Sequence, residues 1–234
     1  MDSHADFGLI DDGSISEVMI YNVQQGRIAE IVEAFQETFA DFKPQGFKIT
    51  FAAADVANNR LIWVHRYEKG FDLTKRFYLG KYPKLAHCLW AGTRFDALEV
   101  SPEELRSSPE ATQFVRIQPV RRREVFDETV KTLEQLKDGL AVELKIYQVK
   151  AGGWSQFLHY WRKIVRLRKA AGFNVEFAVA DISGGRFVWA VSLDGDFNAG
   201  NVDYLSGDDR IAANVISDYI GMFEIPKVVH IPVA

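Results

Sequence analysis

His65 and Tyr67 are the residues best suited to chemistry, and they lie two positions apart in a segment that predicts a strand. Alternate residues of a strand point to the same face, so Leu61, Trp63, His65 and Tyr67 share one face. A histidine can act as an acid or a base near neutral pH. A tyrosine hydroxyl can donate a hydrogen bond to a ligand oxygen. We predict His65 and Tyr67 as catalytic residues; the alternative is two half-buried side chains with satisfied hydrogen bonds.

A second candidate group lies on the strand expected at 17–23 and on its counterpart further along the chain. Glu17 and Tyr21 share one face of the first, and Glu143, Lys145 and Tyr147 share one face of the second. Clustered groups of these types shift one another's pKa and can transfer protons. The alternative is a structural Glu–Lys pair with packed tyrosines. The predicted ligand-binding residues are Glu17, Tyr21, Trp63, Lys145, Tyr147 and Trp189.

These two groups occupy matching places in an internal repeat. Residues 17–86 align without a gap on residues 143–212, at an offset of 126, with 18 of 70 positions identical. Unrelated segments would share about 6%. Trp63 matches Trp189, but His65 and Tyr67 match Val191 and Leu193. The chain is therefore a tandem duplication, and its first copy is the better source of polar groups for a cavity.

Each copy predicts the element order β-α-β-β-α-β, the ferredoxin-like unit. In the first copy, hydrophobic periodicity and turn residues place these elements at 17–23, 27–42, 47–54, 60–67, 73–91 and about 113–120. About 12 extra residues fall in a surface loop near 101–111. The predicted organisation is an N-terminal extension at 1–16, a first repeat at 17–120, a helical connector at 121–142 and a second repeat at 143–234.

The first strand carries apolar side chains on both faces, whereas a half-solvated sheet would alternate apolar and polar residues. Val18 and Ile20 lie on one face, and Met19 and Val23 on the other. Two copies packed face to face would bury both faces. The predicted fold class is therefore α+β, with two tandem ferredoxin-like units packed as an intrachain pseudo-dimeric α/β barrel and helices outside.

The pattern E-x-x-I-Y-x-V-x-x-G, a helix, then G-F and R-x-x-W-x-x-x-Y resembles the dimeric α/β-barrel superfamily, and most closely its NIPSNAP-like branch. The resemblance covers both copies, although Leu193 replaces the closing Tyr in the second. It implies a fold with a barrel cavity. The superfamily includes cofactor-independent monooxygenases, isomerases and chlorite dismutases, so it does not fix one reaction.

The amino-acid composition argues against several classes of partner and cofactor. The net charge is −4, a poor match for non-specific nucleic-acid binding. The single cysteine, Cys88, allows no intrachain disulfide. No apolar run is long enough to span a membrane, and the acidic first 16 residues do not resemble a signal peptide, so we expect a cytoplasmic protein. The five histidines share no metal-ligand spacing. We predict no metal and no cofactor.

The helices at 27–42 and after Gly153 carry opposite charges. The first has an acidic stripe, and the second carries Arg162, Lys163, Arg166, Arg168 and Lys169. The simpler interpretation is that these charged faces point outward into solvent. The alternative is that the acidic and basic outer helices pair between chains and form a homo-oligomer.

Together these features predict a protein that binds a small apolar or aromatic molecule in the barrel, as a cofactor-independent monooxygenase or isomerase. Trp63 and Trp189 would form the walls of its cavity. One alternative is a non-catalytic binding or interaction module whose core is filled by its 17 Phe, 8 Tyr and 5 Trp. A second is a haem protein similar to chlorite dismutases, with His230 as the histidine available in the second half.

Overall fold

The structure, a computed structural model, describes residues 7–100 and 141–231, which form two compact units. The first-copy unit contains described residues 12–97 and 227–231. The second-copy unit contains described residues 7–11, 98–100 and 141–226. Each unit is thus built on one copy of the repeat and completed by a short segment from elsewhere in the chain.

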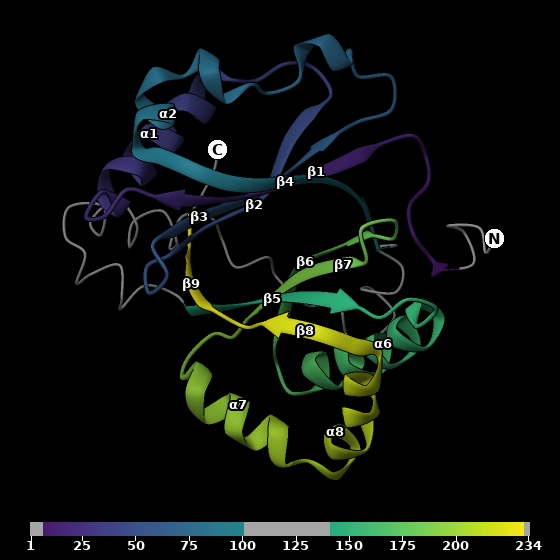
Figure 1. Cartoon of the computed structure of the whole chain (residues 1–234). Helices are drawn as coiled ribbons and strands as arrows, with labels where there is room; N and C mark the ends of the chain where they lie inside the picture. The colour runs from purple at the N-terminus through teal and green to yellow at the C-terminus, as the bar shows by residue number, and fades with distance from the viewer. Residues whose placement is uncertain (1–6, 101–140, 232–234) are drawn as a thin grey trace. The chain divides into compact units, whose positions relative to one another are not determined.

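The first-copy unit is an antiparallel sheet with strand order β4-β1-β3-β2, and β9 pairs with β2. This is the strand order of a ferredoxin-like unit, and α1 and α2 lie against one face of the sheet (Figure 1). The elements are β1 (Ile15–Val23), α1 (Ile28–Asp41), β2 (Phe47–Asp55), β3 (Arg60–Tyr67), the single turns η2 (Leu73–Lys75) and η3 (Leu79–Lys81), α2 (Pro83–Cys88), β4 (Leu89–Glu99) and β9 (Lys227–His230).

Helix α1 forms because its apolar residues recur at helical spacing and give it one buried stripe. Ile31, Val32 and Phe35 are fully buried. The Phe35 ring lies 5.4 Å from the Trp63 ring of β3, centroid to centroid. The helix ends at Asp41, shortly before Pro44, as the sequence predicted. Helix α1 therefore covers the sheet face that carries Trp63.

The second helical region departs from the prediction of one segment at 73–91. It is broken into η2, η3 and α2, and β4 begins at Leu89. Proline disfavours helical backbone in the residue before it, and Tyr82 is accordingly non-helical at φ −123° and ψ 80°. Pro83 then opens α2, where its missing N–H costs no hydrogen bond.

The strand that pairs with β1 also differs from the prediction. It is β4, at Leu89–Glu99, whereas the sequence placed the last strand of the first copy at about 113–120. Strand β4 was not predicted from the sequence, because few of its residues are buried and its hydrophobic pattern is weak. The predicted strand at 113–120, the loop at 101–111 and nearly all of the connector at 121–142 lie outside the described residues.

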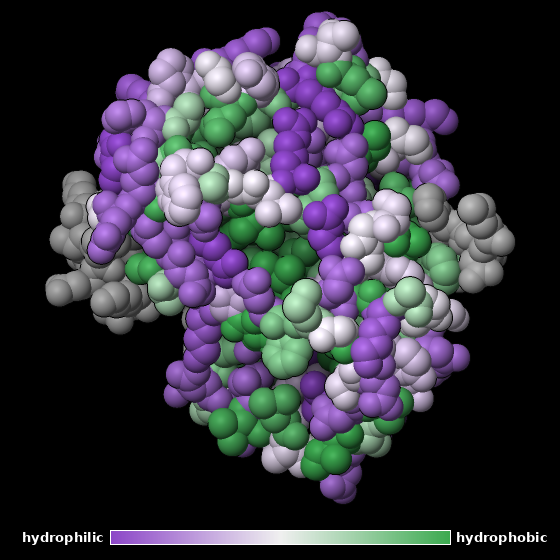
Figure 2. Space-filling view, viewed as in Figure 1, coloured by the Kyte–Doolittle hydropathy of each residue, from purple (hydrophilic) through white to green (hydrophobic). Residues whose placement is uncertain are grey.

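The second-copy unit repeats the strand order as β6-β7-β5-β8, and the end of β4 pairs with β6. Hydrophobic side chains reach the surface over α7 and α8 (Figure 2). Within the described ranges, no helix is long and apolar enough to cross a membrane. The elements are β5 (Ala141–Val149), α6 (Trp154–Ala170), β6 (Asn174–Asp181), β7 (Arg186–Ser192), α7 (Phe197–Ser206), α8 (Asp208–Ala212), η5 (Ala213–Tyr219) and β8 (Ile220–Glu224).

The two copies share their irregular features as well as their strands. A register shift between Ile49 and Phe51 recurs between Val175 and Phe177, at the same offset of 126. The hairpin pair Arg60–Asp55, 2.8 Å apart, recurs as Arg186–Asp181 at 2.7 Å. Features this specific at matching positions support a tandem duplication of one ferredoxin-like unit.

The candidate residues lie on the helix-covered face of each sheet. Trp63 contacts Phe35 of α1, and Trp189 lies 5.7 Å from Trp161 of α6, ring centroid to ring centroid. Trp63 and Trp189 were predicted as walls of a barrel cavity with the helices outside, but both rings pack against helices of their own unit. Strand alternation fixes the two faces of a sheet but not which of them the helices cover.

Candidate functional site

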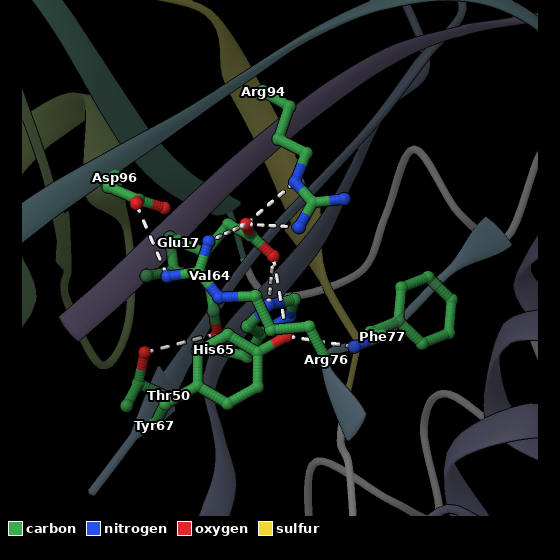
Figure 3. A network of polar contacts seen from close by, with 9 residues as sticks. All are labelled: Glu17, Thr50, Val64, His65, Tyr67, Arg76, Phe77, Arg94 and Asp96. Carbon is green, nitrogen blue, oxygen red and sulfur yellow. Dashed lines mark hydrogen bonds and ion pairs between the residues drawn. The ribbon is translucent and has the colours of Figure 1, made fainter. Parts of the chain in front are cut away.

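Three of the predicted residues meet in the first-copy unit (Figure 3). Glu17 of β1 lies directly opposite His65 of β3 in the antiparallel register. The His65 Nε2 atom lies 2.7 Å from Glu17 Oε2. The Tyr67 hydroxyl donates to the same carboxylate oxygen at 3.4 Å and accepts the Phe77 backbone N–H at 3.0 Å. The carboxylate, the imidazole and the phenol therefore form one hydrogen-bonded group.

Two arginines that the sequence analysis did not identify bind the other oxygen of Glu17. Arg94 of β4 donates from Nε to Glu17 Oε1 at 2.6 Å, and a second guanidinium nitrogen lies 2.5 Å from that oxygen. Arg76 lies 3.7 Å from Glu17 Oε1 and 3.2 Å from Asp96. Their guanidinium groups are partly exposed, whereas Glu17 is almost fully buried. The arginines thus connect the buried carboxylate to the protein surface.

Burial and these contacts set the protonation states. Burial lowers the pKa of His65 and outweighs the opposing effect of Glu17, so the imidazole is neutral at pH 7. Burial alone would raise the pKa of Glu17, but the hydrogen bond from His65 and the charge of Arg94 lower it overall. Burial raises the pKa of Tyr67, which therefore stays a phenol. The group at neutral pH is a carboxylate, a neutral imidazole and a phenol.

The second nitrogen of His65 is the unusual feature of the group. Since the carboxylate can only accept, Nε2 carries the imidazole proton and Nδ1 carries a lone pair. The ring is completely buried, and Nδ1 has no hydrogen-bond partner among the described residues. Buried polar atoms are normally paired, and exceptions often accompany function. His65 Nδ1 is therefore a buried basic atom without a hydrogen-bond partner among the described residues.

Aromatic side chains surround this atom. The His65 ring lies 5.1 Å from Phe47, 4.9 Å from Tyr67 and 6.2 Å from Phe77 between centroids. On the same sheet face, Tyr21 stacks on Trp63 at 5.5 Å. These rings make the surroundings of His65 apolar.

The second-copy unit has a different buried polar group around the matching carboxylate. Glu143 forms an ion pair with Lys145 and another, at 3.3 Å, with Arg168 of α6. All three residues are buried. Arg168 also donates to Asn201 at 2.7 Å. Arg168 was predicted to lie on an outward helix face. That prediction was wrong, because its side chain is buried and pairs with Glu143.

Lys145 and the two remaining predicted residues lie together in this unit. The Lys145 ammonium lies 5.7 Å from the centre of the Trp189 ring. Burial, opposed by Glu143 and reinforced by Arg168, lowers the pKa of Lys145 to about 8. Burial also raises the pKa of Tyr147. Glu17 and Glu143 thus belong to separate groups, each bonded within its own unit.

The haem alternative requires a histidine that faces a buried site in the second half. His159 is exposed on α6, and His230 lies on β9 against Phe51 of the first-copy unit, with ring centroids 5.6 Å apart. Val191, which matches His65, offers no ligand atom. These residues do not fit a haem ligand in the second-copy unit. In the described part of the chain, His, Cys, Asp and Glu do not gather into a group of three that could hold a metal ion.

Comparisons with known proteins identify the fold. No protein-family model matches the sequence, and no curated protein matches it. An anthrone oxidase-like protein of known structure superposes with a TM-score of 0.62 at 12% identity, over 95% of this chain and 94% of that one. A candidate monooxygenase from Lactobacillus acidophilus gives 0.60 at 10% identity, over 93% and 94%.

A mutant chlorite dismutase from Candidatus Nitrospira defluvii also superposes, with a TM-score of 0.51 at 8% identity, over 94% of this chain and 92% of that one. At such identities the likeness concerns the fold. It confirms the predicted dimeric α/β-barrel fold, while the resemblance to NIPSNAP-like proteins stays a prediction.

Proposed function

We propose that this chain, which has the dimeric α/β-barrel fold, binds a weakly acidic aromatic molecule beside His65 and removes a proton from it. The observation that carries the proposal is the lone pair of His65 Nδ1, buried and without a partner, on a ring whose other nitrogen is bound to Glu17. A general base needs this arrangement: one nitrogen fixes the tautomer and the other accepts the proton.

The surrounding residues support the role of His65 in distinct ways. When Nδ1 takes a proton, the ring becomes an imidazolium, and the adjacent Glu17 carboxylate stabilises that charge. Arg94 holds Glu17 in its ionised form. Tyr67 donates to the carboxylate, and Tyr21 and Trp63 offer a stacked aromatic surface. Glu17, Arg94 and Tyr67 are therefore positioning residues, and His65 is the catalytic residue.

The reaction that suits this base is the oxygenation of a carbon acid without a cofactor. An anthrone illustrates the class, because loss of a methylene proton gives a carbanion delocalised over two rings. Molecular oxygen then oxidises that carbon. Both methylene C–H bonds break, one oxygen atom becomes the new carbonyl, and the other leaves as water. The anthrone oxidase-like structure of the same fold supports this choice of substrate class.

Access to His65 requires movement of the segment that covers it. Residues 68–82 form two single 3-10 turns and irregular backbone. Phe71 lies 4.5 Å from the Tyr67 ring, and the Phe77 N–H binds the Tyr67 hydroxyl. Irregular segments with few buried residues open at lower cost than packed helices. We infer that ligands enter by displacing this segment.

The test is oxygen uptake with anthrone, with anthraquinone measured as the product. The wild-type protein should accelerate the reaction, and His65→Gln should reduce the rate by about 10²- to 10⁴-fold, the usual contribution of a general base. His87→Gln is the matched control, because His87 is exposed in the same unit. Equal rates in the wild type and His65→Gln would contradict the proposal.

A second candidate is a non-catalytic protein in which Glu17 and His65 are a structural pair. Their complete burial favours it. In that case His65→Gln would lower the free energy of unfolding, and anthrone would neither bind nor react. Ligand-induced thermal stabilisation of the wild type, absent in His65→Gln, would exclude this candidate.

The expected cytoplasmic location and homo-oligomer also belong to this proposal. The acidic residues Glu33, Glu37 and Asp41 of α1 are exposed, as an interface between oppositely charged outer helices requires. On α6, Arg166 is exposed and Lys163 half-buried, whereas Arg168 is not available. Such an interface would weaken with added salt.

A further inference from the structure

Two buried cations of the second-copy unit share one buried carboxylate. Lys145 and Arg168 are buried, and Arg210 of α8 is half-buried. Glu143 is the carboxylate that pairs with Lys145 and Arg168. Lys145 and Arg168 around this one carboxylate leave an excess of one positive charge, and the half-buried Arg210, which donates to Asn214, adds a guanidinium group nearby. Buried charge without a counter-charge is costly, so this excess calls for an explanation.

The cations are specific to the second copy. At the offset of 126, Lys145 matches Met19, and Arg168 matches Phe42. In the first copy these two residues belong to or pack against the apolar core. The second copy therefore has charged side chains at two positions where the first copy has apolar ones. A buried charge lowers stability unless a counter-charge or hydrogen-bond partners compensate it.

The two guanidinium groups meet at one aromatic ring. The Arg168 guanidinium carbon lies 3.9 Å from the centre of the Tyr204 ring and 4.4 Å from that of Phe173. The Arg210 guanidinium carbon lies 5.5 Å from the same Tyr204 ring. Tyr204 is buried, whereas Tyr78, its counterpart in the first copy, is exposed. The ring thus holds both arginines beside the Glu143–Lys145 pair.

Donor groups in this cluster lack acceptors. Arg168 Nε and Arg210 Nε are buried without a hydrogen-bond partner among the described residues. Each is an N–H group that can only donate. An anion with several oxygen atoms would supply both the missing acceptors and the missing negative charge. Guanidinium groups suit this role because their planar N–H groups match the geometry of carboxylates and phosphates.

We propose that the second-copy unit binds a small oxyanion at a site formed by Lys145, Arg168 and Arg210. Arginine and lysine donors would hold the oxygen atoms, and Tyr204 would keep the two guanidinium groups apart. The site lies in a different unit from His65 and does not depend on the proposed oxygenation.

The experiment is titration calorimetry of the whole chain with inorganic phosphate and, separately, with benzoate, at constant ionic strength set by chloride. Saturable binding of phosphate would indicate a phosphate-bearing ligand, and saturable binding of benzoate a carboxylate. Arg210→Gln should weaken binding by at least about tenfold. Arg166→Gln removes the same charge from an exposed position on α6 and should leave the affinity unchanged.

A second variant should strengthen anion binding instead of weakening it. Glu143 competes with an added anion for Lys145 and Arg168, so Glu143→Gln should tighten binding. Non-specific attraction to basic side chains would weaken equally in Arg166→Gln and Arg210→Gln. That result, or no saturable binding of either probe up to about 10 mM, would overturn the proposal.

Discussion

At the residue scale, the two copies keep one glutamate and change its partners. Glu17 faces His65 across β1 and β3, whereas Glu143 faces Val191 across β5 and β7. The glutamate pairs with an imidazole in one unit and with Lys145 and Arg168 in the other. A neutral base is suited to proton abstraction, and a cationic cluster is suited to anion binding.

Lys145 is expected to make the free energy of unfolding depend on pH in the alkaline range. Burial lowers its pKa from 10.5 to about 8 in the folded state. Between these values the unfolded chain binds more protons, so the free energy of unfolding should rise with pH, by at most about 1.4 kcal/mol per pH unit. Urea unfolding at several pH values between about 8 and 9.5 measures this rise.

Lys145→Met should remove that rise, and Lys163→Met, on the surface side of α6, should keep it. A wild-type stability that falls over the same interval would show that Lys145 is not the group that dominates there.

The individual site residues could be predicted from the sequence, but the contacts between them could not. Glu17, His65 and Tyr67 were predicted from residue type and strand alternation. Their contact depends on the register that places Glu17 opposite His65, which no local pattern encodes. Arg94 was missed because β4 was not predicted, and Arg168 because a run of basic residues usually marks a solvated face.

At the element scale, hydrophobic periodicity predicted the helices and strands correctly where the side chains have a regular pattern of burial. The predicted segments 17–23, 27–42, 47–54 and 60–67 agree with β1, α1, β2 and β3 to within two residues. It failed at 73–91, where Pro83 and the irregular backbone before it interrupt the helix. This broken segment covers His65, while α7 in the second copy is continuous.

Helix α1 is expected to hold the first-copy site in place. Phe35 is fully buried and contacts Phe39 and Trp63. Phe35→Ala should lower the free energy of unfolding by about 3–5 kcal/mol, because it leaves a cavity beneath the helix. Glu33→Ala, at an exposed position of the same helix, should change it by no more than about 0.5 kcal/mol. Similar small effects of both substitutions would mean that α1 does not pack as described.

At the scale of the whole molecule, duplication explains why one chain carries two kinds of polar group. The shared register shifts and hairpin ion pairs preserve the ferredoxin-like unit in both copies. Within that frame, Met19 and Lys145, or His65 and Val191, differ without a change of fold. A repeat is visible in the sequence because its framework residues are kept. Among the divergent positions, His65 and Tyr67 were singled out because Val191 and Leu193 replace them in the second copy.

The central claim is that His65 is a neutral base with a free Nδ1 lone pair, and ¹⁵N NMR of the histidine side chains tests it most directly. At pH 7 we predict one protonated nitrogen, Nε2, and one unprotonated nitrogen, Nδ1, for the signal that disappears in His65→Gln. Because burial lowers the pKa of His65 below its ordinary 6.5, this state should persist below pH 6.5. Two protonated nitrogens at pH 7, or a proton on Nδ1 alone, would contradict the account.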